Sequence, residues 1–232
     1  MLKQRLKRLI NNEFYRIDWV KGELRSIPAG AKILDAGCGK QQFRKFCTHL
    51  NYFSQDFGKY KQDEKDSMTA SHSDYQYGHL DYIGNIWEID APSSSFDAIL
   101  CTEVLEHIPY PNRTIREFGR LLKPGGKLLL TVPSNSLRHM DPFYYYSGFS
   151  DRFLKNALVE NSFSNISVQA IGSYHKWLMV EAYRCMRHEG LLAALFLMPA
   201  FVYHYLRQRK ATQKDINTLC FGYHATAILK ES

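Results

Sequence analysis

The sequence predicts an α/β fold built on a mostly parallel sheet, and three observations carry this prediction. Short apolar runs typical of buried strands alternate with stretches of helical pattern between residues 31 and 132. The chain has 232 residues, of which 45% are hydrophobic and 23% are charged, as in ordinary globular domains. Its five cysteines include no CxxC pair and no zinc-like spacing, so we expect one decorated domain stabilised by its core alone.

The first half of the chain supplies five of the expected strands. They cover residues 31–36, 51–55, 79–84, 96–102 and 127–132. Helices are expected between them at residues 41–50, 103–108 and 114–122. The last of these helices meets Pro124, Gly125 and Gly126, which are typical of a helix end. Strands that alternate with helices form βαβ units, and such units predict a parallel sheet.

The pattern changes after residue 132. Residues 133–150 are rich in serine and aromatic residues and are expected to form a loop. A helix at 153–160 and strands at 166–171 and 224–229 are expected to follow. Residues 191–205 are strongly apolar, but they are shorter than the roughly 20 residues that a membrane span needs. We therefore expect a core-packed or interfacial helix there.

The positive charge is concentrated in two segments. The chain carries a net charge of +7. Residues 1–25 hold seven Lys or Arg against three Asp or Glu, and residues 207–215 hold four against one. The remainder is neutral, which argues against a nucleic-acid-binding face. The basic amphipathic helix expected at residues 2–10 either packs on the domain or contacts an anionic membrane. No apolar segment of signal-peptide length follows it, so a cytoplasmic location is expected.

The most informative segment is Ile33–Gly39, where a strand ends in a tight turn. Gly37 and Gly39 lack a Cβ, so the backbone can approach a ligand closely. A dinucleotide-binding turn would have a third glycine where Gln42 stands, and Asp35 would repel a pyrophosphate. A carboxylate at this position suits a cationic ligand with an ammonium and a sulfonium group, such as S-adenosylmethionine.

Five sequence elements follow one another between residues 32 and 133. They are Ile33–Gly39, Asp56 after the second strand, Ser95–Ile99, Glu103–Ile108 and Leu121–Gly126. In this order and spacing the chain resembles the class I S-adenosylmethionine-dependent methyltransferases, most closely the branch with ubiquinone and menaquinone biosynthesis enzymes. The resemblance implies a Rossmann-like, doubly wound, mostly parallel seven-stranded sheet, with an antiparallel last strand and a helical insertion before it.

The resemblance also suggests how the chain is organised. A basic helical segment at residues 1–30 would precede a methyltransferase domain at residues 31–232. The expected parts of this domain are a cofactor-binding core (31–133), a substrate lid (134–165), a helical insertion (172–216) and a final strand (218–230).

A cofactor site is implied in the same way. The residues expected to bind S-adenosylmethionine are Asp35, Gly37, Cys38, Gly39, Asp56, Asn85, Ile86, Thr102 and Glu103. The glycine turn would line the methionine part, Asp56 would accept hydrogen bonds from the ribose hydroxyls, and Asn85 with Ile86 would contact adenine. The alternative for Asp35 and Asp56 is that they cap helices, and Asn85 could be a plain turn residue.

The implied activity is in-line methyl transfer from S-adenosylmethionine to a small-molecule, lipid or glycan acceptor. A general base is needed only if the acceptor arrives protonated. His139 could remove such a proton, and His107 would pack or close over the site. Glu103 and His107 share a helical face without a third ligand, so no metal site is expected. The alternative is a catalytically lapsed binding or adaptor protein with the same fold.

Three segments raise the question of a membrane partner. The apolar residues 191–205, the basic residues 207–214 and the basic N-terminal helix could together let the protein sit on a membrane surface. The competing interpretation makes residues 191–205 a core or dimer helix. The sequence leaves the oligomeric state open, and it makes a nucleic-acid partner unlikely.

Overall fold

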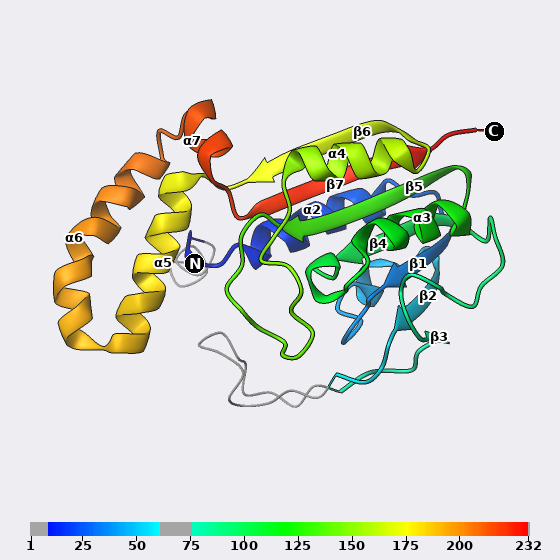
Figure 1. Ribbon diagram of the computed structural model, residues 1–232, viewed down its shortest axis with the longest axis horizontal. Helices are drawn as coiled ribbons and strands as arrows, with labels where there is room; N and C mark the ends of the chain where they lie inside the picture. Colours follow the sequence, from blue (N-terminus) through cyan, green and yellow to red (C-terminus); the bar gives the residue numbers. More distant parts are fainter. Residues whose placement is uncertain (1–8, 61–75, 232) are drawn as a thin grey trace.

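Seven strands of the described chain form a sheet covered by helices on both faces (Figure 1). The computed structural model describes residues 9–60 and 76–231. Along the sheet the strands follow the order β3-β2-β1-β4-β5-β7-β6. The strands are β1 (Lys32–Ala36), β2 (Asn51–Asp56), β3 (Tyr82–Ile83), β4 (Phe96–Thr102), β5 (Leu122–Pro133), β6 (Phe163–Ile171) and β7 (Gly222–Leu229).

The strand directions confirm the predicted fold class. The first five strands pair in parallel, whereas β7 runs antiparallel to both of its neighbours, β5 and β6. The chain therefore turns from β1 outward to β3 and then crosses back to β4 beside β1. At this crossover the loops after β1 and β4 leave in opposite directions, and ligands of open α/β sheets bind in the crevice that results.

Two apolar cores hold the helices against the sheet. Helix α2 (Glu13–Arg25) buries Val20 and Leu24 against one face. Helices α3 (Pro111–Leu121) and α4 (Asp151–Glu160) pack on the other face. Alternate residues of the central strands supply the two cores: Leu100 of β4 belongs to the α2 side, and Ile99 belongs to the side of α3 and α4. This alternation is the period-2 pattern of a strand covered on both faces.

Two of the predicted helices are wrong. Residues 41–50 form turns and one short 3-10 turn, η1 (Arg44–Phe46), because Gln41 has a left-handed φ of 56° that an α-helix cannot accommodate. Residues 103–108 likewise contain only η2 (Leu105–His107), because Glu103 has a φ of 52°. The third strand is also shorter than the predicted 79–84.

Three further helices fill the segment between β6 and β7. They are α5 (Tyr174–Glu189), α6 (Leu191–Gln208) and α7 (Gln213–Thr218). Gly190, at a φ of 84°, joins α5 to α6 in an antiparallel hairpin beyond the carboxyl ends of the parallel strands (Figure 1). Among the described residues, none of the helices meets the length and apolarity needed to cross a bilayer.

The N-terminal prediction falls partly outside the described residues. The basic helix was expected at residues 2–10, and residues 2–8 of it are not described. Leu9 and Ile10 are helical, and Leu9 packs on the cluster of Met179, Val180 and Phe221 at the base of the hairpin.

Candidate active site

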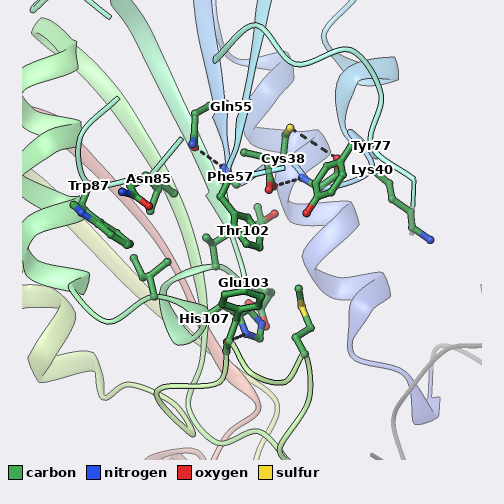
Figure 2. Close-up of a pocket in the computed structure, with 18 of the residues that line it drawn as sticks. Cys38, Lys40, Gln55, Phe57, Tyr77, Asn85, Trp87, Thr102, Glu103 and His107 are labelled. Atoms are coloured by element: carbon green, nitrogen blue, oxygen red, sulfur yellow. Dashed lines mark hydrogen bonds between the residues drawn. The ribbon is translucent and has the colours of Figure 1, made fainter. Parts of the chain in front are cut away.

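A cavity of about 520 Å³ opens at the carboxyl ends of β1, β2 and β4 (Figure 2). Eight of the nine residues predicted to bind the cofactor line it: Gly37, Cys38, Gly39, Asp56, Asn85, Ile86, Thr102 and Glu103. The eight residues come from four separate stretches of the sequence, yet they line one cavity. Asn85 and Trp87 face the cavity from one side, and Glu103 and His107 lie at its lower end (Figure 2).

The glycine turn after β1 is held by β2. The backbone N–H of Gly37 donates to the carbonyl of Gln55 at 2.9 Å, and the N–H of Cys38 donates to the same oxygen at 3.0 Å. The side-chain amide of Gln55 also donates to the carbonyl of Gly84 at 2.8 Å. Gln55 therefore fixes the turn and the loop before Asn85 relative to each other. Sequence analysis did not single out Gln55.

Gly37 is required by space as well as by conformation. Its φ is 72°, and a Cβ placed there would lie 2.5 Å from a methyl carbon of Val104. A contact that short cannot be relieved by a small shift, so a larger residue would displace the segment after β4. Only glycine keeps the turn open beside the cavity.

Asp56, the last residue of β2, combines a buried carboxylate with a position on the cavity wall. Its Oδ2 accepts the N–H of Gly39 at 3.0 Å, and its Oδ1 accepts that of Gly58 at 3.2 Å. Burial raises the pKa of Asp56, and these two backbone donors act in the opposite direction. A carboxylate oriented in this way fits the predicted acceptor for ribose hydroxyls.

Asp35 lies behind the turn rather than in the cavity wall. It is 2% exposed, and the hydroxyl of Tyr52 donates to its Oδ2 at 2.7 Å. Burial raises the pKa of Asp35 to about 7, although the Tyr52 hydrogen bond lowers it. Asp35 is thus the one predicted cofactor residue that does not line the cavity. Any influence on a cationic ligand would act through the thin layer of the glycine turn.

Arg16 of α2 is a cavity residue that sequence analysis missed. Its guanidinium Nη1 lies 3.4 Å from Oε2 of Glu103, whose Oε1 accepts the hydroxyl of Thr131 at 2.9 Å. Its Nε is buried and has no hydrogen-bond partner among the described residues. Nothing in the pattern of α2 indicates this contact, because it depends on how the helix packs across the end of β4. A guanidinium suits a carboxylate such as that of the methionine part of the cofactor.

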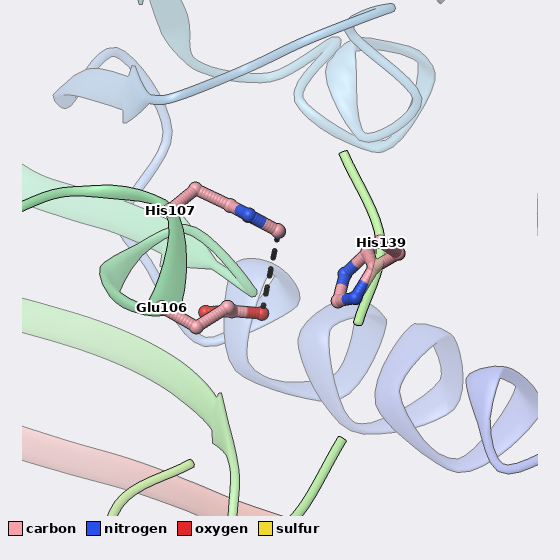
Figure 3. A group of neighbouring side chains, drawn as sticks. All are labelled: Glu106, His107 and His139. Atoms are coloured by element: carbon pink, nitrogen blue, oxygen red, sulfur yellow. Dashed lines mark ion pairs between the residues drawn. The ribbon is translucent and has the colours of Figure 1, made fainter. Parts of the chain in front are cut away.

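Two neighbouring side chains of η2, Glu106 and His107, lie close together (Figure 3), and of the two only His107 lines the cavity. Glu106 is 1% exposed, its Oε1 lies 3.8 Å from Nε2 of His107, and its Oε2 has no partner among the described residues. The Nδ1 of His107 lies 2.8 Å from the carbonyl of Phe143, so Nδ1 carries the proton and Nε2 keeps a lone pair. Burial lowers the pKa of His107 to about 4 and raises that of Glu106.

His139 lies beside this pair but outside the cavity lining. Its ring centroid is 4.6 Å from that of His107, and its Nδ1 lies 2.8 Å from the carbonyl of Leu137. The ligand atoms of Glu106, His107 and His139 all lie within 4.8 Å of one another, so the three could also hold a divalent cation. The sequence motif suggested no such set, because its third member comes from the loop after β5.

The rest of the lower wall is apolar and largely aromatic. Its members, called the aromatic wall below, are Phe57, Ile108, Met140, Phe143 and Tyr145. The loop after β5 is tied to η2, because the backbone N–H groups of Tyr145 and Tyr146 both donate to the carbonyl of Glu106. This loop therefore closes one side of the cavity, whereas the rest of the predicted lid segment, up to residue 165, forms α4 and the start of β6.

Comparison with known proteins identifies the family. A family model described as "Methyltransferase domain" matches residues 11–182, which is most of the chain. The chain belongs to this methyltransferase family. Membership confirms the resemblance read from the sequence, and it makes S-adenosylmethionine the cofactor.

Curated relatives point to one branch of the family. Residues of this chain are 36% identical over 119 positions to the ubiquinone biosynthesis O-methyltransferase of Xanthomonas axonopodis pv. citri. A related enzyme of Xanthomonas oryzae pv. oryzae is also 36% identical. Each match covers 50% of this chain and 48% of the relative, so the chain spans about half the length of these enzymes.

Solved structures share the fold at low sequence identity. Phosphoethanolamine N-methyltransferase 2 of Haemonchus contortus, bound to S-adenosyl-L-methionine, matches with a TM-score of 0.51 and 18% identity, over 90% of this chain and 51% of that one. A methyltransferase of Archaeoglobus fulgidus matches with a TM-score of 0.53 and 15% identity, over 91% and 93%. The [4+2]-cyclase SpnF reaches 0.57 at 18% identity, over 94% and 81%. The same fold thus serves more than one chemistry, so the acceptor has to be inferred from the site.

The cavity fits the cofactor that the family uses. Its upper part offers the backbone of the glycine turn, the carboxylate of Asp56, and Asn85 with Ile86 beside Trp87. The guanidinium of Arg16 adds a cation for a carboxylate. The buried Nε donor of Arg16, which has no partner among the described residues, is a feature that a purely structural role would not require.

Proposed function

We propose that this enzyme methylates a hydroxyl group of a small aromatic acceptor, of the kind found in quinone precursors. The observation that carries the proposal is the position of His107, whose side chain lines the cavity between the cofactor-binding wall and the aromatic wall. The curated relatives that match half of this chain are named ubiquinone biosynthesis O-methyltransferases, and this name describes methyl transfer to an oxygen atom.

The division of labour follows from the residues. The bound cofactor supplies a methyl group activated by the positive charge of its sulfonium. Asp56 and the glycine turn hold the cofactor, and the aromatic wall with Phe143 positions a flat acceptor so that its oxygen approaches the methyl carbon in line. Positioning of this kind supplies most of what methyl transfer needs.

A hydroxyl acceptor must also lose its proton. The lone pair on Nε2 of His107 can accept it, because Nδ1 is occupied by the carbonyl of Phe143. Glu106 lies 3.8 Å from Nε2, and its carboxylate, in the ionised form, would stabilise the resulting imidazolium. His139 touches His107 ring to ring and acts as a positioning residue.

The test compares two histidines. With a short-chain catechol as acceptor, His107→Ala is expected to lower kcat by roughly 100-fold, the usual contribution of a general base. His139→Ala should have a smaller effect, and neither should change cofactor affinity measured by calorimetry. Product identity is read from the mass of the methylated catechol.

Three outcomes would count against the proposal. Absence of S-adenosylmethionine binding would favour the alternative of a lapsed adaptor protein. Unchanged turnover in His107→Ala would show that His107 is not the general base. Activity that a chelator abolishes and Mg²⁺ restores would assign the cluster of Glu106, His107 and His139 to a metal ion instead.

The proposed location is cytoplasmic, at the periphery of a membrane. All five cysteines of the chain are free, as in a reducing compartment. An acceptor with an isoprenoid tail would itself be held in a membrane, which makes a surface-bound enzyme useful. Fractionation of cells that produce the full chain, with and without high salt, tests this location.

A further inference from the structure

Helix α6 exposes a continuous apolar face. Leu191 is 89% exposed, Leu195 is 70% and Phe196 is 72%, and Val202 and Leu206 continue the same face at helical spacing. The opposite face of α6 packs on α5, with Phe201 and Tyr205 against the cluster of Met179 and Val180. One apolar face of α6 is buried against α5. The second apolar face is left in water, which is typical of a surface that binds another partner.

The charges around this face are mostly positive. Helix α6 contains no Asp or Glu, and its end leads into Arg207, Arg209, Lys210 and Lys214. Across the whole helical segment, residues 174–218 hold seven Lys or Arg against three Asp or Glu. All three acids already have partners: Glu181 pairs with Arg184 at 3.3 Å, Asp215 caps α7, and Oε1 of Glu189 lies 2.9 Å from Nδ1 of His188.

We propose that α6 lies in the interface of an anionic phospholipid bilayer. Its exposed leucines and Phe196 insert among the acyl chains, and the basic residues that follow meet the phosphate headgroups. This is the arrangement of an interfacial helix with apolar insertion and electrostatic attraction combined. The segment stays on the surface, in keeping with the absence of a spanning helix from the described residues.

A second copy of the chain is a poorer occupant. A two-fold contact would place the same surface on both sides of the interface. Antiparallel α6 helices would bring Arg209 and Lys210 of one copy toward the Arg184 and Arg187 end of the other, and parallel helices would bring the basic ends together. No acid on α6 compensates in either case, whereas an anionic lipid surface does.

The hairpin also lies where such a surface would serve the active site. Its base is joined to α2 by Lys176, whose Nζ lies 2.6 Å from the hydroxyl of Tyr15 and 3.9 Å from the ring centroid. Arg16, the next residue of α2, lines the cavity. The use of the surface for acceptor delivery rests on the proposed function, whereas the lipid binding itself does not.

Flotation with vesicles tests the inference on the full chain. Vesicles of equal parts phosphatidylcholine and phosphatidylglycerol should carry the protein upward at low salt. Vesicles of phosphatidylcholine alone should bind it at least roughly tenfold more weakly, because each basic residue near an anionic surface adds about a fivefold gain. Raising the salt should release it through screening.

Matched variants separate insertion from charge. Leu195→Glu combined with Phe196→Glu should abolish flotation, whereas Val159→Glu, at an exposed apolar position of α4, should not. Arg209→Gln combined with Lys210→Gln should weaken binding roughly 25-fold, and Arg116→Gln on the exposed side of α3 should leave it unchanged. All variants alter exposed side chains, and calorimetry with S-adenosylmethionine checks that each is folded.

The contrary results are equally definite. No flotation of the wild-type chain, or flotation that survives Leu195→Glu with Phe196→Glu, overturns the inference. A dimer in sedimentation velocity that the same double variant dissociates would assign the face to a second copy. If the wild-type chain floats with the vesicles but does not bind S-adenosylmethionine, the proposed function is refuted and the membrane contact stands.

Discussion

The cofactor wall and the acceptor wall of the cavity are built in different ways. The cofactor wall is mostly backbone, and hydrogen bonds from Gln55 and Asp56 fix the glycine turn between two neighbouring strands. The acceptor wall, which is the aromatic wall together with His107, consists mostly of side chains from η2 and the loop after β5. These two segments are joined through the carbonyls of Glu106 and Phe143. The first wall tolerates almost no change in shape, whereas the second can be altered one side chain at a time. This difference suits a family that keeps one cofactor and varies its acceptors.

The largest expected effect comes from the most rigid point of the cofactor wall. Gly37→Ala places a Cβ 2.5 Å from Val104 and should abolish measurable binding of S-adenosylmethionine by calorimetry. Gly30→Ala is the matched control, because Gly30 has a similar φ of 80° but nothing within 4 Å of its Cβ position. The control should lose about 1–2 kcal/mol of stability from the left-handed conformation and keep its affinity. Equal affinities in the two variants would show that Gly37 does not border the cofactor.

The next effect tests the carboxylate on the same wall. Asp56→Ala removes the proposed acceptor of two ribose hydrogen bonds, and it should weaken cofactor binding by at least about 100-fold, since each hydrogen bond to a charged group contributes about 1.5–3 kcal/mol. Asp56→Asn keeps one acceptor and should lose about tenfold. S-adenosylmethionine titrations of both variants give the comparison, and a larger loss in Asn than in Ala would contradict the assigned contact.

A smaller effect is expected where the two walls meet. Arg16→Gln removes a partly exposed guanidinium 3.4 Å from Glu103, and the affinity for S-adenosylmethionine should fall about tenfold while kcat changes little. Arg25→Gln, in the last turn of the same helix and exposed, controls for lost charge. If Arg16→Gln lowers kcat but spares affinity, the guanidinium acts through Glu103 on the acceptor side.

The difference between the cofactor wall and the acceptor wall also explains which parts of the site could be predicted from the sequence. The strands and the glycine turn were predictable, because hydrophobic runs and the segment Ile33–Gly39 are local patterns. Eight of the nine cofactor residues that the family resemblance implied line the cavity. Arg16 was not predictable, because it reaches the site through the packing of α2. The proximity of His139 to Glu106 was not predictable either, because the loop after β5 brings His139 to η2.

The failed helix predictions have a physical cause in single residues. The alternation of strands and helices predicted helices at 41–50 and 103–108, yet Gln41 and Glu103 adopt left-handed φ values. Both lie within stretches that line the cavity, at residues 37–43 and 102–104, so the backbone there follows the cavity wall. Local propensity is overridden at positions where the site dictates the path of the backbone.

The smallest expected effect concerns Asp35, the carboxyl behind the glycine turn. Its pKa is raised from 3.8 to about 7 in the folded chain, chiefly by burial, so the folded state binds more protons than the unfolded state between these values. The contribution of Asp35 to stability is therefore present below about pH 4 and is lost as the pH rises through about 7. Asp35→Asn stays neutral and can still accept the hydroxyl of Tyr52. In thermal unfolding without cofactor, the free energy of unfolding of the variant should rise relative to that of the wild type from pH 5 to pH 8, by a few kcal/mol at most. Parallel stability curves would mean that Asp35 is already ionised in the folded chain at pH 5, and the electrostatic pull on a sulfonium through the turn would then be at full strength throughout this range.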